Sequence, residues 1–419
     1  MLFIIEIVKV YLEVYGCSAN QGDASIMQGI IEKEGHEVVS KKEDADAFVL
    51  VTCTVIDTTQ QRMINRIKEM KKYGKKFIVA GCMASAQPEL IKKIHASAEL
   101  LPPNYVHCIS DLLNGKKKFY PSLKSGLPRR IDLRLNYPIS DGCLYNCSYC
   151  ITKRARGKLV SYPVEQIVDD LRNAVEKGCK EIRLTSQDTA GYGRDIGENL
   201  PNLINKVSDI DGEFRIRIGM MHPLSAYRII DELIDAYKNE RVYKFLHLPL
   251  QSGSPEILKA MRRSYTPEMF KEIVHEFRRK FRDFTLATDI IVAFPGEDEE
   301  HFKMSVDAIF EIKPDVTNIT RFSARPNTEA KKMKKISTKI AKERSKILTE
   351  ITNKISLEKN KKLIGREFKC LILKKYKGYY IGKTNSYKSV FVKNAEIGKF
   401  IKVRTISATP THLNAIYLN

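Results

Sequence analysis

Three cysteines stand close together on one short segment of the chain. Cys143, Cys147 and Cys150 have a C-x-x-x-C-x-x-C spacing and follow an expected strand. Three thiolates on one tight loop can hold three irons of a 4Fe–4S cube, which leaves the fourth iron without a protein ligand. A structural zinc site is the alternative, but it needs four Cys or His ligands, and the nearest histidine in sequence is His107. The ligand count and spacing therefore favour an iron–sulfur cluster, whose open iron can bind the amino and carboxylate groups of S-adenosylmethionine (SAM).

Three other cysteines each follow an expected strand in the first third of the chain. Cys17, Cys53 and Cys82 come after the strands expected at 10–15, 47–51 and 76–80. The carboxyl ends of parallel strands meet at one edge of a sheet, so we expect these thiols to converge and hold a second cluster. The alternative is three small buried residues, because cysteine is often buried. Repetition at three successive strand ends favours the cluster. The remaining cysteines, Cys108, Cys179 and Cys370, lack such partners and are expected to be ordinary buried residues.

An α/β fold in two successive sections must position these cysteines. In the first section the apolar strands alternate with helices expected at 22–34, 60–72 and 88–95, which predicts a parallel sheet covered on both faces. A basic linker follows at 114–130. The alternation then restarts with six strands, expected at 136–140, 181–185, 214–218, 244–248, 285–292 and 316–322, and with helices at 164–177, 224–238, 267–280 and 299–311. This pattern predicts a (β/α)6 partial TIM barrel whose chemistry lies on the loops after the strands.

The hydrophobic pattern and the net charge of the last section differ from those of the rest of the chain. A helix is expected at 336–359, and short strands at 368–373, 379–382, 389–392 and 400–404 then predict a small β-barrel of the class that binds single-stranded nucleic acid. The net charge is +21, and Lys361–Asn419 alone carries 13 Lys and Arg against 2 Asp and Glu. Such an excess predicts a polyanionic partner. The aromatic residues there either stack on bases or form the barrel core; they are Tyr376, Tyr379, Tyr380, Phe391 and Phe400.

The three expected domains comprise residues 1–125, 126–358 and 359–419. The apolar opening Met1–Val8 is interrupted by Glu6 and is too short to span a bilayer, so no membrane segment is expected. The interpretation is a cytoplasmic protein whose nine cysteines are reduced and available as ligands.

The two cysteine sets together resemble the radical-SAM tRNA methylthiotransferases over nearly the whole chain. Three segments, Cys150-Ile-Thr-Lys-Arg-Ala-Arg-Gly157, the run 184–193 and the run 287–297, resemble the branch that modifies threonylcarbamoyladenosine. So does Phe245-Leu-His-Leu-Pro-Leu-Gln-Ser-Gly253. Two positions depart from the family pattern: Val51 stands where Asn is usual, and Asn327 where Gly is usual. Both bear on local loop geometry and leave every thiol in place.

The resemblance implies an N-terminal methylthiotransferase domain, a radical-SAM barrel and a C-terminal RNA-binding TRAM barrel. It implies two 4Fe–4S clusters and two uses of SAM. One SAM methylates a sulfur on the auxiliary cluster, and another yields a 5′-deoxyadenosyl radical that abstracts hydrogen from carbon 2 of the adenine. The implied substrate is the hypermodified adenosine 3′ to the anticodon, in a tRNA anticodon stem-loop. An electron donor such as ferredoxin or flavodoxin and a sulfur source are also implied.

The resemblance places Tyr149 near the SAM adenine, although an aromatic there can equally be core. Polar residues after the barrel strands are candidates for SAM contact or for helix capping; they are Ser186, Gln187, Asp188, Gln251, Arg263 and Asp289. His222 and His247 are expected to be structural residues with satisfied hydrogen bonds. Two other functions stay open: another radical-SAM RNA or protein methyltransferase, and a non-catalytic metal-stabilised RNA-binding protein.

Overall fold

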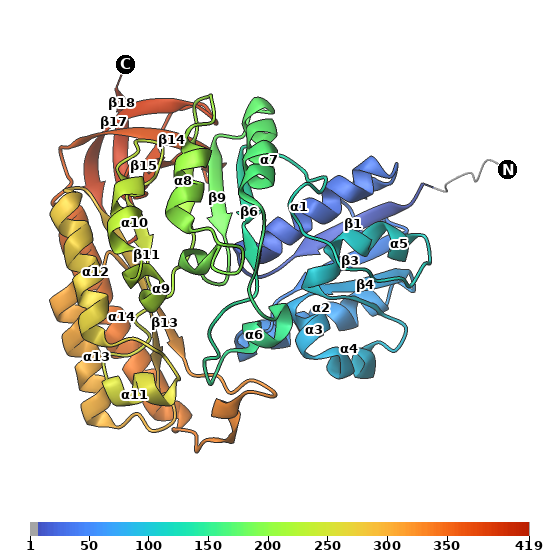
Figure 1. The fold of residues 1–419 in the computed structure, drawn as a ribbon, viewed down its shortest axis with the longest axis horizontal. Coiled ribbons are helices and arrows are strands. Elements are labelled where there is room, and N and C mark those ends of the chain that lie inside the picture. The colour runs from blue at the N-terminus through green and yellow to red at the C-terminus, as the bar shows by residue number, and fades with distance from the viewer. Residues whose placement is uncertain (1–6, 419) are drawn as a thin grey trace.

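The structure is a computed structural model that describes residues 7–418, so most of the apolar opening lies outside the described residues. Three parts follow one another along the chain (Figure 1). A parallel α/β domain lies at one side, a partial barrel lies in the middle, and a small closed β-barrel is formed by the C-terminal strands. Within residues 7–418, no helix has the length and apolarity needed to cross a bilayer.

The N-terminal domain is a five-stranded parallel sheet with the order β2-β1-β3-β4-β5. Its strands are β1 (Lys9–Val14), β2 (Glu37–Val39), β3 (Ala47–Thr52), β4 (Lys76–Gly81) and β5 (Glu99–Leu101). Sequence analysis found the three central strands. It missed β2 and β5, because each is only three residues long and shows no measurable period.

Helices cover both faces of this sheet, as predicted. One face packs against α1 (Ser18–Lys33), η1 (Pro103–Cys108) and α5 (Ile109–Leu113). The other packs against α2 (Asp57–Lys71), α3 (Cys82–Ala86) and α4 (Pro88–Ile94). Strand β3 is buried along its whole length, which explains its continuous apolar sequence.

The middle section is an open barrel of six parallel strands. It consists of β6 (Arg134–Pro138), β9 (Glu181–Thr185), β10 (Arg215–Ile218), β11 (Phe245–His247), β12 (Thr285–Val292) and β13 (Val316–Arg321). The strands form two sheets, β10-β9-β6 and β11-β12-β13, which a parallel bridge from Ile216 to Val242 connects. The barrel interior therefore opens between β6 and β13, and the partial barrel prediction is confirmed.

Helices surround the barrel. They are α7 (Val164–Glu176), α8 (Leu200–Ser208), α9 (Pro223–Tyr227), α10 (Ile230–Tyr237), α11 (Pro255–Ala260), α12 (Pro267–Lys280) and α13 (Glu299–Ile312). Three of them, α7, α12 and α13, match expected ranges, while α8 and α11 were not predicted. The single helix expected at 224–238 is wrong: the backbone leaves the helical region at Ile229 (φ −126°, ψ 25°), which separates α9 from α10. Side-chain caps start several helices; Thr266, for example, accepts the Met269 N–H at 3.3 Å at the start of α12.

Short elements complete the cysteine loop and the segment before the last domain. Strands β7 (Ser140–Asp141) and β8 (Val160–Ser161) pair antiparallel on either side of α6 (Ile151–Arg156). Single turns of 3₁₀ helix occur at η2 (Thr189–Gly191) and η3 (Glu329–Lys332). The long helix α14 (Thr338–Lys361) packs against β13 and leads into the C-terminal domain.

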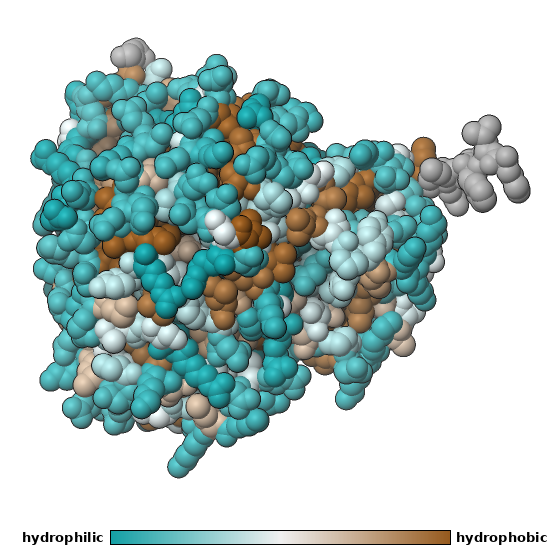
Figure 2. All heavy atoms as spheres, in the orientation of Figure 1, coloured by the Kyte–Doolittle hydropathy of each residue, from teal (hydrophilic) through white to brown (hydrophobic). Residues whose placement is uncertain are grey.

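The C-terminal domain is a closed five-stranded barrel with the order β14-β15-β16-β18-β17. Its strands are β14 (Glu367–Tyr376), β15 (Tyr379–Thr384), β16 (Ser389–Val392), β17 (Phe400–Ala408) and β18 (Leu413–Leu418). The buried carboxylate of Asp315 accepts hydrogen bonds from Lys359 at 2.6 Å and Lys388 at 2.7 Å. These bonds join α14 and the C-terminal barrel to the central barrel. The face of the molecule that Figure 2 shows is mostly hydrophilic.

Candidate cluster-binding sites

The first cysteine triad lies on a tight loop between β7 and α6. Cys150 is the N-cap of α6, and its N–H donates to the Cys147 carbonyl at 3.1 Å. The Tyr145 N–H donates to Cys143 Sγ at 3.4 Å. Gly142 has φ +74°, and a Cβ there would lie 1.8 Å from the Lys158 carbonyl oxygen, so this position requires glycine. The backbone therefore fixes the loop that carries the three thiols.

Buried surroundings disfavour the thiolate form of these cysteines when no cation is near. Burial raises the pKa of Cys143 to about 12, and the negative charge of Asp188 adds to this shift. Burial also raises the pKa of Cys150. A bound metal would supply positive charge here, because a coordinated metal deprotonates a thiol that would otherwise keep its proton. Arg263 supplies one protein cation, since its Nη1 donates to Cys147 Sγ at 3.3 Å.

The second triad is assembled from three separate loops at the carboxyl edge of the N-terminal sheet. Cys17 is the N-cap of α1, Cys53 directly follows β3, and Cys82 is the first residue of α3. A Cβ at Gly16 would lie 2.9 Å from Cys53 Cβ, so the first two loops are in close contact. The structure thus brings together three residues that lie far apart in sequence.

Asn20 connects the three loops of the second triad. Its Nδ2 donates to the carbonyls of Tyr15 at 2.8 Å and Thr52 at 2.9 Å. Its Oδ1 accepts from Cys82 Sγ at 3.7 Å. Burial raises the pKa of Cys82 to about 12, and the neighbouring Cys17 contributes to this shift. Sequence reasoning did not single out Asn20, although it stands three residues after Cys17.

Each triad has the donor set of an iron–sulfur cluster with one open iron. Among residues 7–418, no three Cys, His, Asp or Glu side chains stand at the spacing that one metal ion requires. The thiolates of a cube each bind a different iron, so they stand farther apart than the ligands of a zinc ion. Each triad supplies three thiols, which is the number that leaves one iron open.

The two triads are neighbours in the fold. Helix α3 begins with Cys82, helix α6 is capped by Cys150, and these two helices pack against each other. Both helices lie where the N-terminal domain meets the barrel (Figure 1). The junction between the domains therefore brings the two sets of thiols to one region of the molecule.

Four charged residues form a buried cluster at this junction, which we name the interdomain charge cluster: Asp23, Lys124, Asp141 and Arg156. Arg156 donates to Asp23 at 2.6 Å and to Asp141 at 2.7 Å, and Lys124 bridges the same two carboxylates at 2.6 Å each. Arg156 Nη2 also donates to Asn20 Oδ1 at 3.0 Å. Although burial raises the pKa of Asp141, Lys124 and Arg156 lower it to about 2. The sequence contained one indication of the interdomain charge cluster: Arg156 belongs to the segment that follows the third cysteine of the first triad.

The polar residues after β9 lie close to the first triad. The buried carboxylate of Asp188 accepts from the His222 N–H at 2.8 Å and from Ser225 Oγ at 2.6 Å. Burial raises the pKa of Asp188. Ser186 Oγ lies 2.7 Å from Ser140 Oγ. Gln187 Oε1 is buried and has no hydrogen-bond partner within the described chain. The structure thus brings these residues together and leaves an acceptor free.

The candidates after β11 and β12 fall into two groups. Gln251 has φ +68° and a buried Oε1 without a partner, and Arg263 has a buried Nη2 without a partner, in the described part of the chain. Asp289 instead accepts from His247 Nε2 at 3.1 Å and from Asn318 Nδ2 at 2.7 Å. Burial raises the pKa of Asp289, but these two hydrogen bonds and the His247 charge give a net lowering.

Three further residues have clear surroundings in the structure. Tyr149 packs edge-on against Phe294, with ring centroids 6.2 Å apart, inside an apolar cluster. The prediction of satisfied hydrogen bonds is wrong for His222: its buried ring stacks on Tyr145 at 3.6 Å, and neither ring nitrogen has a partner among residues 7–418. Asn327 has φ +59°, which Asn tolerates better than most residues and which explains how it replaces the usual glycine.

The fold and the two triads define the class of protein, a radical-SAM enzyme with an additional α/β domain. Residues 137–309 match the Radical SAM superfamily, and residues 9–101 match the uncharacterized protein family UPF0004. A solved radical S-adenosylmethionine methyltransferase from Kitasatospora setae, with cobalamin and a 4Fe–4S cluster bound, has a TM-score of 0.58 at 16% identity. The match covers 78% of this chain and 74% of that one, and it shows a shared fold.

Two relatives specify the family within this class. The probable threonylcarbamoyladenosine tRNA methylthiotransferase of Methanocaldococcus jannaschii is 45% identical over 413 residues, which cover 96% of this chain and 95% of the relative. The threonylcarbamoyladenosine tRNA methylthiotransferase of Homo sapiens is 33% identical over 415 residues, which cover 94% of this chain and 71% of the relative. The chain belongs to the threonylcarbamoyladenosine tRNA methylthiotransferase family.

Proposed function

We propose that this chain transfers a methylthio group to carbon 2 of threonylcarbamoyladenosine in tRNA, at the position 3′ to the anticodon. The observation that carries the proposal is the pair of adjoining cysteine triads, one on the barrel loop and one at the sheet edge. The second triad argues against a radical-SAM methyltransferase that does not insert sulfur. A non-catalytic RNA-binding protein would have no use for a cysteine triad that leaves one iron of a bound cluster open beside buried polar groups that lack partners within residues 7–418.

The cluster ligands in this proposal are Cys143, Cys147 and Cys150 for the SAM-binding cluster, and Cys17, Cys53 and Cys82 for the auxiliary cluster. When bound, the first cluster supplies an electron to SAM and the second holds the sulfur that is transferred. The chain itself orients these groups. Arg263 donates to Cys147 Sγ, and its Nη2 has no partner in the described part of the chain, which suits a ligand carboxylate.

The remaining SAM contacts come from buried groups around the first triad. Gln187 and Gln251 each hold a buried acceptor without a partner within residues 7–418, which suits the amino or ribose groups of SAM. Asp188 and Ser186 shape the same wall, Tyr149 supplies an apolar surface for the adenine, and Asp289 orients His247. These roles fit the observed surroundings of each residue.

The proposal also includes the bounds of the three domains, the electron donor and the sulfur source. The RNA-binding domain comprises residues 359–419, after the N-terminal domain at 1–125 and the barrel at 126–358; its exposed Tyr376 and its lysines are suited to RNA. The enzyme works in the cytoplasm, where a ferredoxin or flavodoxin delivers electrons and a separate source provides sulfur.

The test is a methylthiolation assay under anaerobic conditions. The reconstituted protein is incubated with SAM, a reductant and tRNA that carries threonylcarbamoyladenosine, and digested nucleosides are analysed by mass spectrometry. We expect 5′-deoxyadenosine and the methylthio derivative of the nucleoside. A matched tRNA with unmodified adenosine at the same position is the control. Formation of 5′-deoxyadenosine with methylation but no sulfur insertion would overturn the proposal.

A further inference from the structure

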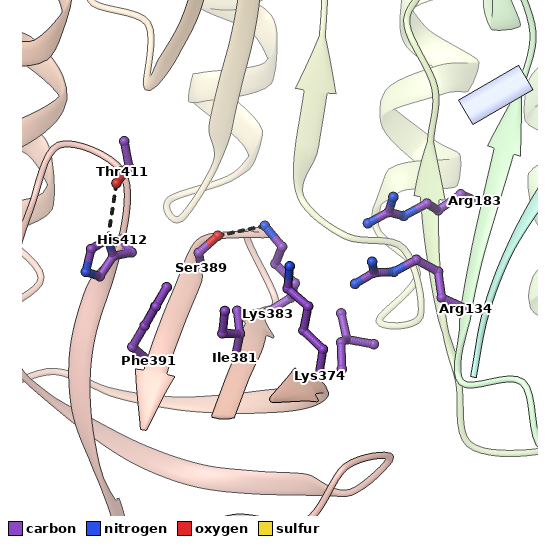
Figure 3. Close-up of a pocket in the computed structure, with 10 residues that line it drawn as sticks. Arg134, Arg183, Lys374, Ile381, Lys383, Ser389, Phe391, Thr411 and His412 are labelled. Carbon is purple, nitrogen blue, oxygen red and sulfur yellow. Dashed lines mark hydrogen bonds between the residues drawn. The ribbon is translucent and has the colours of Figure 1, made fainter. Parts of the chain in front are cut away.

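A cavity of about 380 Å³ lies between the central barrel and the C-terminal domain, and we name it the junction pocket. The residues that matter for its chemistry are Arg134, Arg183, Lys374, Lys383, Phe391 and His412. The two arginines come from β6 and β9, while the other four come from the C-terminal barrel. Figure 3 shows both guanidinium groups pointing across the gap toward the two lysine ammonium groups. Two domains therefore direct cations into one space.

The positive charge of the junction pocket is only partly neutralised. Glu181 accepts from Arg134 at 3.1 Å and from Arg183 at 2.6 Å, so one carboxylate serves both arginines. In the part of the chain that the structure describes, no carboxylate lies within ion-pairing distance of Lys374 or Lys383. Burial lowers the pKa of Lys383 to about 7; the charge of Glu181 opposes this shift, and the positive charges of Arg183 and Arg134 add to it. An anion in the pocket would relieve this imbalance.

The opposite wall of the junction pocket is aromatic and hydroxyl-bearing. The ring of Phe391 lies 4.2 Å from that of His412, with an angle of 36° between them. Ser389 Oγ accepts from Lys383 Nζ at 2.9 Å and directs that ammonium group along the wall (Figure 3). Cations opposite a partly exposed aromatic ring suit a phosphate that is followed by a ribose or base.

We infer that the junction pocket binds one backbone phosphodiester of the tRNA, with the adjoining ribose or base against Phe391. This inference rests on the proposed function, because it assigns a contact to the same RNA substrate. Arg134 begins β6, while the first cysteine triad follows the other end of that strand. A five-residue strand is about 16 Å long, so the pocket and the triad lie at opposite ends of β6 and are separated by roughly that length. The pocket therefore contributes to RNA binding and lies away from the reacting atoms.

The test compares two double variants of the reconstituted full-length enzyme. Arg134→Gln with Lys374→Gln removes two pocket cations, while Arg172→Gln with Lys346→Gln removes two exposed cations outside the pocket and outside the RNA-binding domain. The Kd for tRNA is measured over a range of salt concentrations. The pocket variant should bind about tenfold more weakly, with a salt slope lower by about one to two, and the control should stay within about twofold.

The variants also separate this inference from the proposed function. The pocket variant should keep the wild-type kcat at saturating tRNA, because the cavity does not touch the reacting groups. Equal Kd losses in both variants, or no loss in either, would overturn the inference even if the wild type methylthiolates tRNA. Failure of the wild type to insert sulfur, with the Kd difference intact, would overturn the function alone. Tight binding of AMP that is lost in the pocket variant, with unchanged tRNA affinity, would assign the pocket to a free nucleotide instead.

Discussion

Arg156 donates a hydrogen bond of 2.6 Å to Asp23, and this bond joins α6 of the barrel to α1 of the N-terminal domain. Both side chains are fully buried. The same guanidinium group reaches Asn20, which connects the loops of the second triad. One residue therefore links the helix capped by Cys150 to the loops that carry the other three thiols.

Replacing Arg156 with Met should destabilise the protein strongly. The variant leaves two buried carboxylates with Lys124 as their one remaining cationic partner among residues 7–418, and breaking a buried pair typically costs about 3–5 kcal/mol. The free energy of unfolding, measured by urea denaturation, should fall by that amount. Arg172→Met is the control, since Arg172 pairs with Asp169 on the surface and should matter little. A loss below about 1 kcal/mol for Arg156→Met would show that the interdomain charge cluster contributes little to stability.

The cluster assignment predicts how iron content responds to cysteine replacement. After anaerobic reconstitution the intact protein should hold about eight irons, and replacing Cys17, Cys53 and Cys82 with Ala should leave about four. Replacing the first triad should also leave about four.

The three other cysteines provide the matched control for this measurement. Cys108, Cys179 and Cys370 are buried and lie outside both triads, so their replacement by Ala should leave the iron content unchanged. About four irons in both the intact protein and the second-triad variant would mean that no auxiliary cluster exists. The radical-SAM assignment would then survive without sulfur insertion.

His222 should make the apoprotein less stable in acid. Burial and the Arg263 charge lower its pKa to about 2. Below the ordinary histidine pKa of about 6.5 the unfolded chain binds a proton that the native ring rejects, so stability falls as the pH falls. His222→Phe should remove this loss and be more stable than the wild type by about 2 kcal/mol at pH 5, with a smaller difference at pH 7.

Thermal unfolding between pH 5 and pH 7 measures this difference. His275→Phe is the control, because the His275 side chain is exposed and its replacement should not change the pH dependence. A stability difference between His222→Phe and the wild type that is constant across this range would contradict the prediction.

Gly29 should resist a substitution that ordinarily favours a helix. Alanine usually stabilises a helix interior relative to glycine by about 0.5–1 kcal/mol. In α1, however, a Cβ at Gly29 would lie 2.4 Å from the backbone of Arg129 in the linker. Gly29→Ala should therefore lower the free energy of unfolding by about 1–3 kcal/mol and make the linker more sensitive to protease.

Gln28→Ala provides the comparison for Gly29→Ala. Gln28 precedes Gly29 in α1, and its side chain points in a different direction. Its replacement should change the free energy of unfolding by less than about 0.5 kcal/mol. Equal stability of Gly29→Ala and the wild type in urea unfolding would show that the linker moves aside at little cost.

Local sequence patterns predicted much of the fold. The ranges of β9, β12 and α12 match those expected, because each has a clear pattern of apolar residues and boundary residues that show where it begins and ends. The closed C-terminal barrel followed from short strands and turn residues. The two edge strands and the break at Ile229 were missed, since three-residue strands and a single non-helical residue leave almost no periodic signal.

The sequence by itself determined the thiols and the elements that carry them, because cysteine spacing and strand ends are local properties. Only the tertiary structure decided which distant side chains meet. Asn20 at the second triad, Lys124 beside Arg156, and Arg134 facing Lys374 each depend on how whole domains pack. Packing of this kind satisfies buried charges and polar groups through partners far away in the chain, and no local pattern encodes those partners.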